Sequence, residues 1–303
     1  MVNEAESAPR PVLVATDLSD PSGAAISCAH VRARAAGAPL VVLHVIDYIP
    51  SLPPLSPGAA DALPPALAEH QSRLARLLGE RVEQLTGRRS DGFQVRVEFG
   101  RPYATIIQRA EQLDVAQIVV ASRGASGVGR LVLGSVAERV VRHAHCPVLV
   151  MRPGNDTGPV LAATDLSDAA LPAVEAAAQE ARTRNLPLAV LHDLDTVPWL
   201  ASAMAPLGPV PLAPAPETID KVRAAAAEVL DSAMRRIGVE GSQLVTTEGN
   251  PVAAILRTAE ARDASIIVVG TRGRTGLARL ALGSVAESVI RHSHCSVLAV
   301  RVS

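Results

Sequence analysis

Short apolar runs alternate along the chain with longer segments of helical spacing. In the first half the runs are rich in Val, Ile and Leu, and they fall at residues 12–15, 40–46, 95–99, 117–121 and 148–151. Such runs are typical of strands that are buried on both faces of a sheet. Since a helical segment separates each run from the next, the pattern predicts alternating strands and helices.

Helical periodicity is clearest in the segment that precedes the third predicted strand of each half. We expect its apolar residues, which recur at steps of three, four and seven, to share one buried face. These residues are Leu67, Leu74, Leu77, Leu78, Val82 and Leu85 in the first half, and Ile219, Val222, Ala226, Val229, Leu230 and Ile237 in the second.

The whole pattern occurs twice. PVLVATDLSD at residues 11–20 returns as PVLAATDLSD at residues 159–168. Residues 121–151 align with residues 270–300 without a gap, and 18 of these 31 positions are identical. Because the period has the length of a domain, the sequence indicates a tandem duplication. We expect domains at 1–152 and 159–303, joined by a linker rich in turn-forming residues.

The alternation predicts that each domain is α/β and doubly wound, with a five-stranded parallel sheet flanked by four helices. We expect the strand order 3-2-1-4-5 in each sheet. Equivalent surfaces favour two-fold packing, so we expect the halves to form a pseudo-dimer within the chain, with a further homodimer left open. Ligands of such sheets bind beyond the carboxyl ends of the strands, where the strand order reverses.

Composition narrows the classes of function. The 303 residues are 48% apolar and carry a formal net charge of −1, with only five aromatic side chains, so no nucleic acid partner is expected. No apolar run reaches the length of a membrane span, and no apolar signal segment is visible at the N-terminus. Three cysteines cannot build a disulfide framework, which favours a cytoplasmic location.

Lysine is almost absent, since Lys221 is the only one. A phosphate-binding loop of the Gly-Lys-Ser/Thr type is therefore excluded. No Ser–His–Asp set and no pair of carboxylates recurs at one strand edge in both halves, so the sequence nominates no catalytic residue. Whether the protein is an enzyme stays uncertain, and catalysis is not indicated.

The first strand of each half ends in the same Thr-Asp pair. The pairs are Thr16 with Asp17, and Thr164 with Asp165. The Asp carboxylates are candidates for capping the following helix, but Ser19 and Ser167 are better placed for that role. We therefore expect both Asp side chains to face the ligand crevice.

A glycine pattern follows the fourth strand of each half. Its residues are Ala121, Arg123, Gly124, Gly134 and Ser135 in the first half, and Gly270, Arg272, Gly273, Gly283 and Ser284 in the second. Glycines let the backbone approach phosphate oxygens, a helix N-terminus adds exposed N–H groups, and arginine supplies positive charge. One such spacing is also compatible with a plain surface loop, but its recurrence behind the same strand favours an anion site.

These motifs resemble those of the universal stress protein family. Both halves look like UspA-type domains, and the chain is similar to a tandem universal stress protein over nearly its whole length. The ATP-binding subclass carries Gly-x-x-Gly, nine residues and Gly-Ser/Thr, which the second half matches fully and the first matches except at Ala121. The resemblance implies ATP or a related adenine nucleotide as ligand, with Mg²⁺ as an optional companion.

The resemblance also implies roles for single residues. Asp17 and Asp165 would lie on the ribose–adenine side, and Val45 would line the adenine through its backbone, where the second half has Asp193. The phosphates and ribose would be held by the motif glycines and the residues that follow them, namely Ser135, Val136 and Ala137, and Ser284, Val285 and Ala286.

The function implied is a stress-response protein that senses or sequesters ATP with little turnover. A slow ATPase or phosphotransferase, and a nucleotide-free adaptor that acts through protein contacts, are the alternatives left open. The second half keeps all the motif glycines, so we expect both halves to bind ATP and the second to bind it more tightly.

Two further sequence features, a His-x-His-Cys repeat and a pair of proline-rich inserts, are not assigned a function. Residues 143–146 and 292–295 repeat a His-x-His-Cys sequence that suggests a soft metal site. Side chains two positions apart do not share a helix face, and a small buried hydrophobe is expected before the last strand, so no metal is predicted. The proline-rich inserts at residues 48–65 and 194–216 are a lid, a partner site or a dimer contact, and the sequence does not decide.

Overall fold

A computed structural model describes residues 8–47, 65–87, 92–124, 133–194, 216–239, 241–271 and 282–301. The chain divides into two compact units, residues 1–153 and 154–303. The proline-rich inserts lie outside the described residues except at their ends. None of the helices in the described ranges combines the length and the apolar character needed to cross a membrane.

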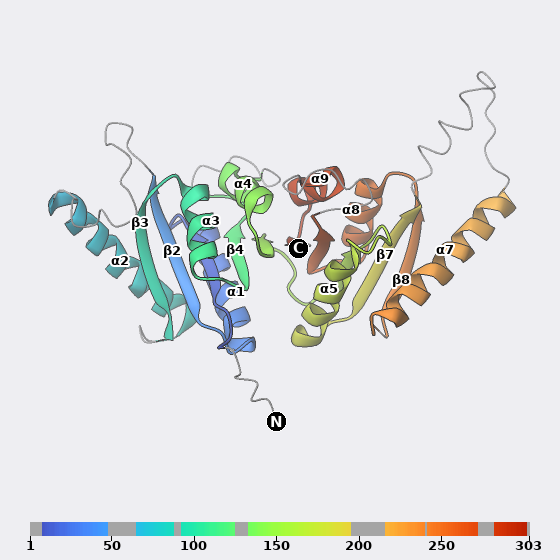
Figure 1. The fold of residues 1–303 in the computed structure, drawn as a ribbon, viewed down its shortest axis with the longest axis horizontal. Helices are drawn as coiled ribbons and strands as arrows, with labels where there is room; N and C mark the ends of the chain where they lie inside the picture. Colours follow the sequence, from blue (N-terminus) through green and yellow to red (C-terminus); the bar gives the residue numbers. More distant parts are fainter. Residues whose placement is uncertain are drawn as a thin grey trace, which may run out of the picture. The chain divides into compact units, whose positions relative to one another are not determined.

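The first unit alternates strands and helices without interruption (Figure 1). Its elements are β1 (Val12–Thr16), α1 (Asp20–Ala35), β2 (Leu40–Asp47), α2 (Pro65–Thr86), β3 (Gln94–Gly100), α3 (Pro102–Gln112), β4 (Gln117–Ala121), α4 (Ser135–His143) and β5 (Val148–Met151). The strands are parallel and lie in the order β3-β2-β1-β4-β5. Helix α1 packs against α2, and α3 packs against α4.

The second unit repeats this plan. Its elements are β6 (Val160–Ala163), α5 (Leu171–Arg184), β7 (Leu188–Leu194), α7 (Pro216–Arg236), β8 (Gln243–Glu248), α8 (Pro251–Ala261), β9 (Ile266–Gly270), α9 (Ser284–His292) and β10 (Ser296–Val300). The order β8-β7-β6-β9-β10 is again all parallel. The predicted α/β fold, with strand order 3-2-1-4-5 in each half, is confirmed. The packing of one half against the other stays a prediction.

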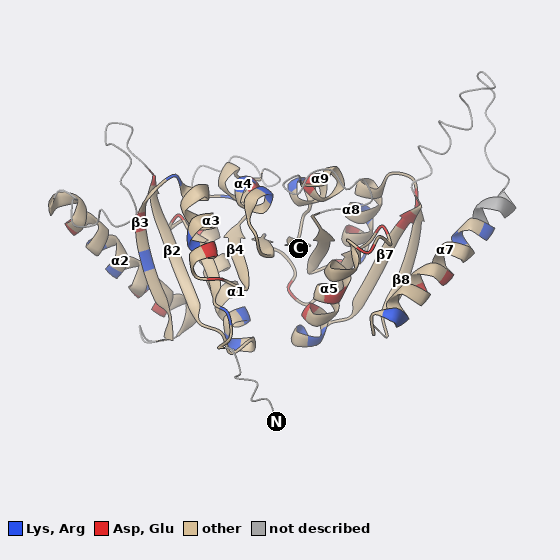
Figure 2. Ribbon diagram, in the orientation of Figure 1, with Lys and Arg blue, Asp and Glu red and all other residues tan. Residues whose placement is uncertain are grey.

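The central strands are buried because their residues are apolar. Leu13 and Val14 of β1 are fully buried, as are Leu161 and Ala162 of β6. Charged residues lie mainly on the helices and in the segments that connect the elements (Figure 2). Each sheet therefore forms the middle layer of its unit, and its carboxyl edge is left to the loops.

The predicted apolar faces of α2 and α7 are partly wrong. Leu78 and Leu230 are fully buried, but Leu77 beside the first is 45% exposed and Val229 beside the second is 54% exposed. Val222, also assigned to the buried face, is 49% exposed. Successive residues turn by about 100° around a helix, so a face centred on Leu78 or Leu230 turns its neighbour outward. The buried face of α7 includes Met234, which the sequence analysis did not include.

The two cysteines that precede the last strands are buried, as the sequence predicts. Cys146 is 4% exposed and Cys295 is 2% exposed. His145 lies no nearer than 3.9 Å to the carboxylate of Glu111. In the described part of the chain, no three His, Cys, Asp or Glu side chains are grouped so that they could hold a metal ion.

The adjacent leucines of α2 provide a matched test of this packing. We expect Leu78→Ala to lower the free energy of unfolding by about 3 kcal/mol, because it removes a fully buried side chain and leaves a cavity. Leu77→Ala should cost less than about 1 kcal/mol, because that side chain is half exposed. Urea denaturation of the intact chain measures both, and equal losses would show that the helix packs through a different face.

Burial raises the pKa of the Cys146 thiol to about 11. The thiolate, which is the nucleophile, is therefore scarce at pH 8 in the folded protein. We expect Cys146 to react with a disulfide reagent at pH 8 only after unfolding, and its reaction to begin as the pH approaches 11. Mass-spectrometric mapping of labelled cysteines measures this, with Cys146→Ser as the blank, and rapid labelling of native protein at pH 8 would contradict it.

Candidate functional site

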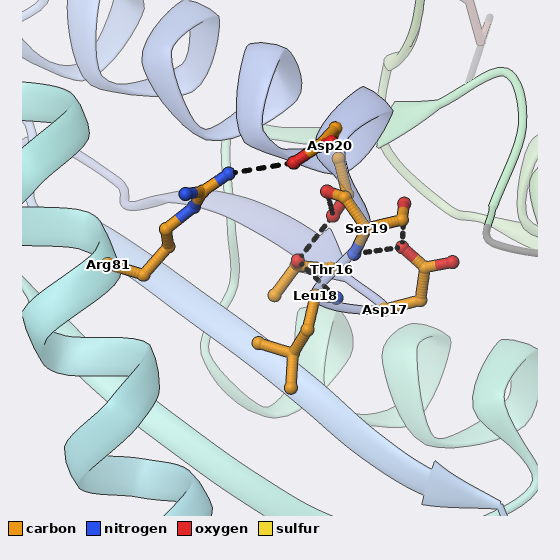
Figure 3. Close-up of polar contacts among 7 residues, drawn as sticks. Thr16, Asp17, Leu18, Ser19, Asp20 and Arg81 are labelled. Carbon is orange, nitrogen blue, oxygen red and sulfur yellow. Dashed lines mark hydrogen bonds and ion pairs between the residues drawn. The ribbon is translucent and has the colours of Figure 1, made fainter.

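The end of β1 is fixed by a chain of hydroxyl groups. The N–H of Leu18 donates to Thr16 Oγ1 at 3.0 Å, and Ser22 Oγ donates to the carbonyl of Ser19 at 2.8 Å. Thr16 Oγ1 lies 2.7 Å from Ser22 Oγ. Because the single proton of Ser22 is used on Ser19, Thr16 is the donor in this last contact. These bonds set the path of the backbone from the sheet into α1 (Figure 3).

Asp17 is held in an exposed position by a tight local turn. Its Oδ1 accepts the N–H of Ser19 at 3.1 Å and also the hydroxyl of Ser19 (Figure 3). Leu18 between them has φ 68°, a left-handed conformation that is costly for a residue with a side chain. The expected capping role of Ser19 is wrong, because Ser19 stands at the N-cap of α1 but its hydroxyl makes no capping bond.

The second half builds the same turn. Leu166 has φ 63°, and its N–H donates to Thr164 Oγ1 at 3.0 Å. Asp165 Oδ1 accepts the N–H and the hydroxyl of Ser167 at 3.0 and 2.6 Å. Ser167 is not the expected cap either, because α5 begins later and its N-cap is Ala170. A strained turn that occurs at the same place twice points to a functional constraint.

The turn after β1 meets the glycine motif at Gly124. A Cβ atom on Gly124 would lie 2.3 Å from Asp17 Oδ2, which is closer than any real contact. Asp17 Oδ2 is the end of an exposed side chain, so a residue with a Cβ at 124 would displace this carboxylate from its place beside the backbone. The structure thus brings together Asp17 and Gly124, which are far apart in the sequence. Arg123, the residue before Gly124, is half-buried. Their counterparts Arg272 and Gly273 lie outside the described residues.

The far end of the motif is tied back to the sheet. The N–H of Gly134 donates to the carbonyl of Ser122 at 2.8 Å, and the N–H of Gly283 donates to the carbonyl of Thr271 at 2.9 Å. Each glycine is the N-cap of the next helix, α4 or α9. The helix N-terminus is thereby fixed at the carboxyl edge of the sheet, next to the reversal of the strand order.

The first turns of α4 and α9 present backbone donors. Their first helical bonds run from Glu138 N–H to the Gly134 carbonyl, at 3.0 Å, and from Glu287 N–H to the Gly283 carbonyl, at 2.9 Å. Neither helix has a side-chain cap. The N–H groups that precede these bonds are those of Ser135, Val136 and Ala137, and of Ser284, Val285 and Ala286. Such donors, with the positive end of the helix dipole, form an anion-binding arrangement.

Glycine is not required for the backbone at either N-cap. Gly134 has φ −66° and Gly283 has φ −62°, values that any residue adopts. A Cβ at each would lie 3.4 Å from the carbonyl oxygen of Ser122 or Thr271, which is a van der Waals contact. Glycine is itself a favoured N-cap residue, and among the described residues no atom closer than 3.4 Å opposes a side chain at either position.

Ala121, the departure from the glycine motif, causes no strain. It ends β4, paired with Met151, and is not among the residues with positive φ. Its methyl group therefore has no conformational cost. Gly270 ends β9 in the same way, paired with Val300.

The second strand of each half carries a histidine whose role is structural. His44 Nδ1 lies 2.9 Å from the carbonyl of Thr16, and His192 Nδ1 lies 2.9 Å from that of Thr164. A carbonyl only accepts, so Nδ1 carries the proton in both rings. The register that pairs Thr16 with His44 places the next residue, Val45, level with Asp17.

Asp193, the counterpart of Val45, is only half satisfied. Its Oδ1 accepts the hydroxyl of Thr247 at 2.6 Å, across the β7–β8 pair. Its Oδ2 is buried and has no hydrogen-bond partner within the described residues. Sequence reasoning identified the carboxylate but missed Thr247, because a cross-strand partner follows from register and not from spacing along the chain.

Comparisons with known proteins agree on one family. The profile of the Universal stress protein family matches residues 9–152 and again residues 157–301. A universal stress protein of Mycolicibacterium smegmatis is 29% identical over 96% of both chains. One from Mycobacterium tuberculosis strain CDC 1551 is 31% identical over 77% of this chain and 70% of its own length.

Solved structures show the same fold over the full length. A universal stress protein from Archaeoglobus fulgidus superposes with a TM-score of 0.63 at 24% identity, covering 96% of both chains. A functionally unknown protein from Pseudomonas aeruginosa gives a TM-score of 0.65 at 22% identity, covering 97% of this chain and 93% of its own. With both halves matched by the family profile, the chain belongs to the universal stress protein family and carries two copies of its domain.

Proposed function

We propose that each half binds ATP at the carboxyl edge of its sheet, and that the protein is a stress-response factor that senses or sequesters this nucleotide with little turnover. The observation that carries the proposal is the start of α4 and of α9. There, three N–H groups precede the first helical bond, next to an N-cap glycine that places no side chain beside them.

The geometry of these residues suits phosphate. The N–H groups of residues 135–137 and 284–286 would donate to phosphate oxygens, as would the hydroxyl groups of Ser135 and Ser284. Arg123 and Arg272 would supply positive charge. Asp17 and Asp165 would contact the ribose–adenine side, and Mg²⁺, when present, would be held mainly by the phosphates.

Little turnover is expected from what surrounds this site. Phosphoryl transfer needs a base or a residue that orients water, in line with the leaving group. The sequence shows no Ser–His–Asp set and no pair of carboxylates that recurs at one strand edge in both halves, so it nominates no residue for this role. Release of inorganic phosphate from ATP by the purified protein measures turnover, and multiple turnovers per minute would favour the ATPase alternative.

The N-cap glycines provide the main test of binding. Gly283→Val should abolish most ATP binding by the second half, because the side chain occupies the space that phosphate would use beside the N–H groups. Gly134→Val should do the same in the first half. Isothermal titration of each single variant leaves one site to measure and tests the prediction that the second half binds more tightly.

Gly79→Ala is the matched control. Gly79 lies within α2, and among the described residues nothing outside its own stretch of helix lies within 4 Å of an added Cβ, so this substitution should leave binding unchanged and stabilise the helix by up to about 1 kcal/mol. Unchanged ATP affinity in the Gly134→Val, Gly283→Val double variant, with a native circular dichroism spectrum, would refute the site.

The cytoplasmic location and the formation of a homodimer stay predictions.

A further inference from the structure

The two halves differ in where they keep a carboxylate near the candidate site. In the first half Glu98 of β3 forms an ion pair with Arg109 of α3 at 2.8 Å, and Val45 lies beside it on β2. In the second half the positions aligned with Glu98 and Arg109 hold threonines, Thr247 and Thr258, and that of Val45 holds Asp193. The carboxylate has moved one strand inward and has lost its arginine.

This carboxylate points to the layer that contains the phosphate donors. Glu248 of β8 pairs with Arg223 of α7 at 2.7 Å, so Glu248 faces α7. Successive side chains alternate across a strand, so Thr247 and its partner Asp193 face the opposite side, which α8 covers. Helix α9, with its N-terminal donors, packs against α8 in that same layer.

Register fixes the distance of Asp193 from the donors. Asp193 comes two residues after Leu191, which pairs with Ala163, so it lies level with Asp165 at the end of β6. Strands β7 and β9 flank β6, which separates them by about 10 Å. A nucleotide whose phosphates lie on α9, behind β9, reaches this far with its base.

The free acceptor on Asp193 indicates which chemical group of a ligand it would bind. Oδ1 is occupied by the Thr247 hydroxyl, whereas Oδ2 is buried with no partner in the described part of the chain. A buried acceptor without a donor lowers stability, and a donor from a ligand restores the lost interaction. A carboxylate also repels phosphate, so the complementary group is an N–H of the base.

We propose that Asp193 selects the base in the second site, by accepting a hydrogen bond from the exocyclic amine of adenine on Oδ2. This inference rests on the proposed function. Inosine triphosphate is the discriminating probe, because it carries a carbonyl oxygen where ATP has the amine and so places one acceptor against another. The first site has Val45 at this position and so lacks this side-chain acceptor, and its preference for ATP should be smaller.

The test uses the full chain with one site at a time. In the Gly134→Val background, where only the second site is intact, ATP should bind at least about tenfold more tightly than inosine triphosphate in calorimetry. Adding Asp193→Val should reduce this ratio to that of the Gly283→Val chain, in which only the first site remains. Asp193→Asn should lower the ratio further, because Thr247 holds the amide oxygen and leaves the NH₂ group in the place of Oδ2.

A thermal melt without nucleotide supplies an independent measurement. Asp193→Val should not lower the melting temperature, because it removes an unsatisfied buried oxygen. Equal affinity for ATP and inosine triphosphate in the Gly134→Val chain would overturn the role of Asp193 while leaving ATP binding in place. A folded Gly134→Val chain that binds neither nucleotide would overturn the proposed function of the second half as well.

Discussion

The candidate site depends on a single type of hydrogen bond, made once in each half. The N-cap glycine donates its N–H to the carbonyl that follows the fourth strand, from Gly134 to Ser122 and from Gly283 to Thr271. This bond holds the first turn of α4 or α9 at the carboxyl edge of the sheet, so that its next three N–H groups converge where an anion can lie. Without it, the donors would have no fixed relation to the strands.

The opposite side of the site is formed by the turn after the first strand, whose left-handed backbone is stabilised by hydrogen bonds to neighbouring side chains. Leu18 and Leu166 both adopt left-handed backbone, and the Thr and Asp side chains that precede them accept the N–H groups of the turn. In the first half Asp17 Oδ2 occupies the place that a Cβ at position 124 would take, so a larger residue there would displace the carboxylate. Turn and glycine motif therefore constrain each other, although more than a hundred residues separate them.

Duplication has left the two sites with the same scaffold and different electrostatics. The scaffold consists of backbone groups, which substitutions change little, so the glycine bonds and the turns are nearly identical in both halves. The difference lies in the side chains level with the base end of the crevice. The first half has Glu98, which is paired with an arginine, and the neutral Val45. The second half has Asp193, one of whose oxygens has no partner among the described residues.

The sequence by itself determined the duplication, the alternation of strands and helices and the place of the glycine motif, because buried parallel strands are continuous apolar runs. The order of the strands within each sheet is a property of the tertiary structure. Tertiary structure decided which helix side chains are buried and which side chains are paired by hydrogen bonds. Packing left Leu77 and Val229 exposed. The hydroxyl of Ser19 donates to the carboxylate of Asp17 and makes no capping bond to α1. Tertiary structure also paired Asp193 with Thr247 through one oxygen and left the other without a partner in the part of the chain that the structure describes, because strand register, and not spacing along the chain, selects the partner.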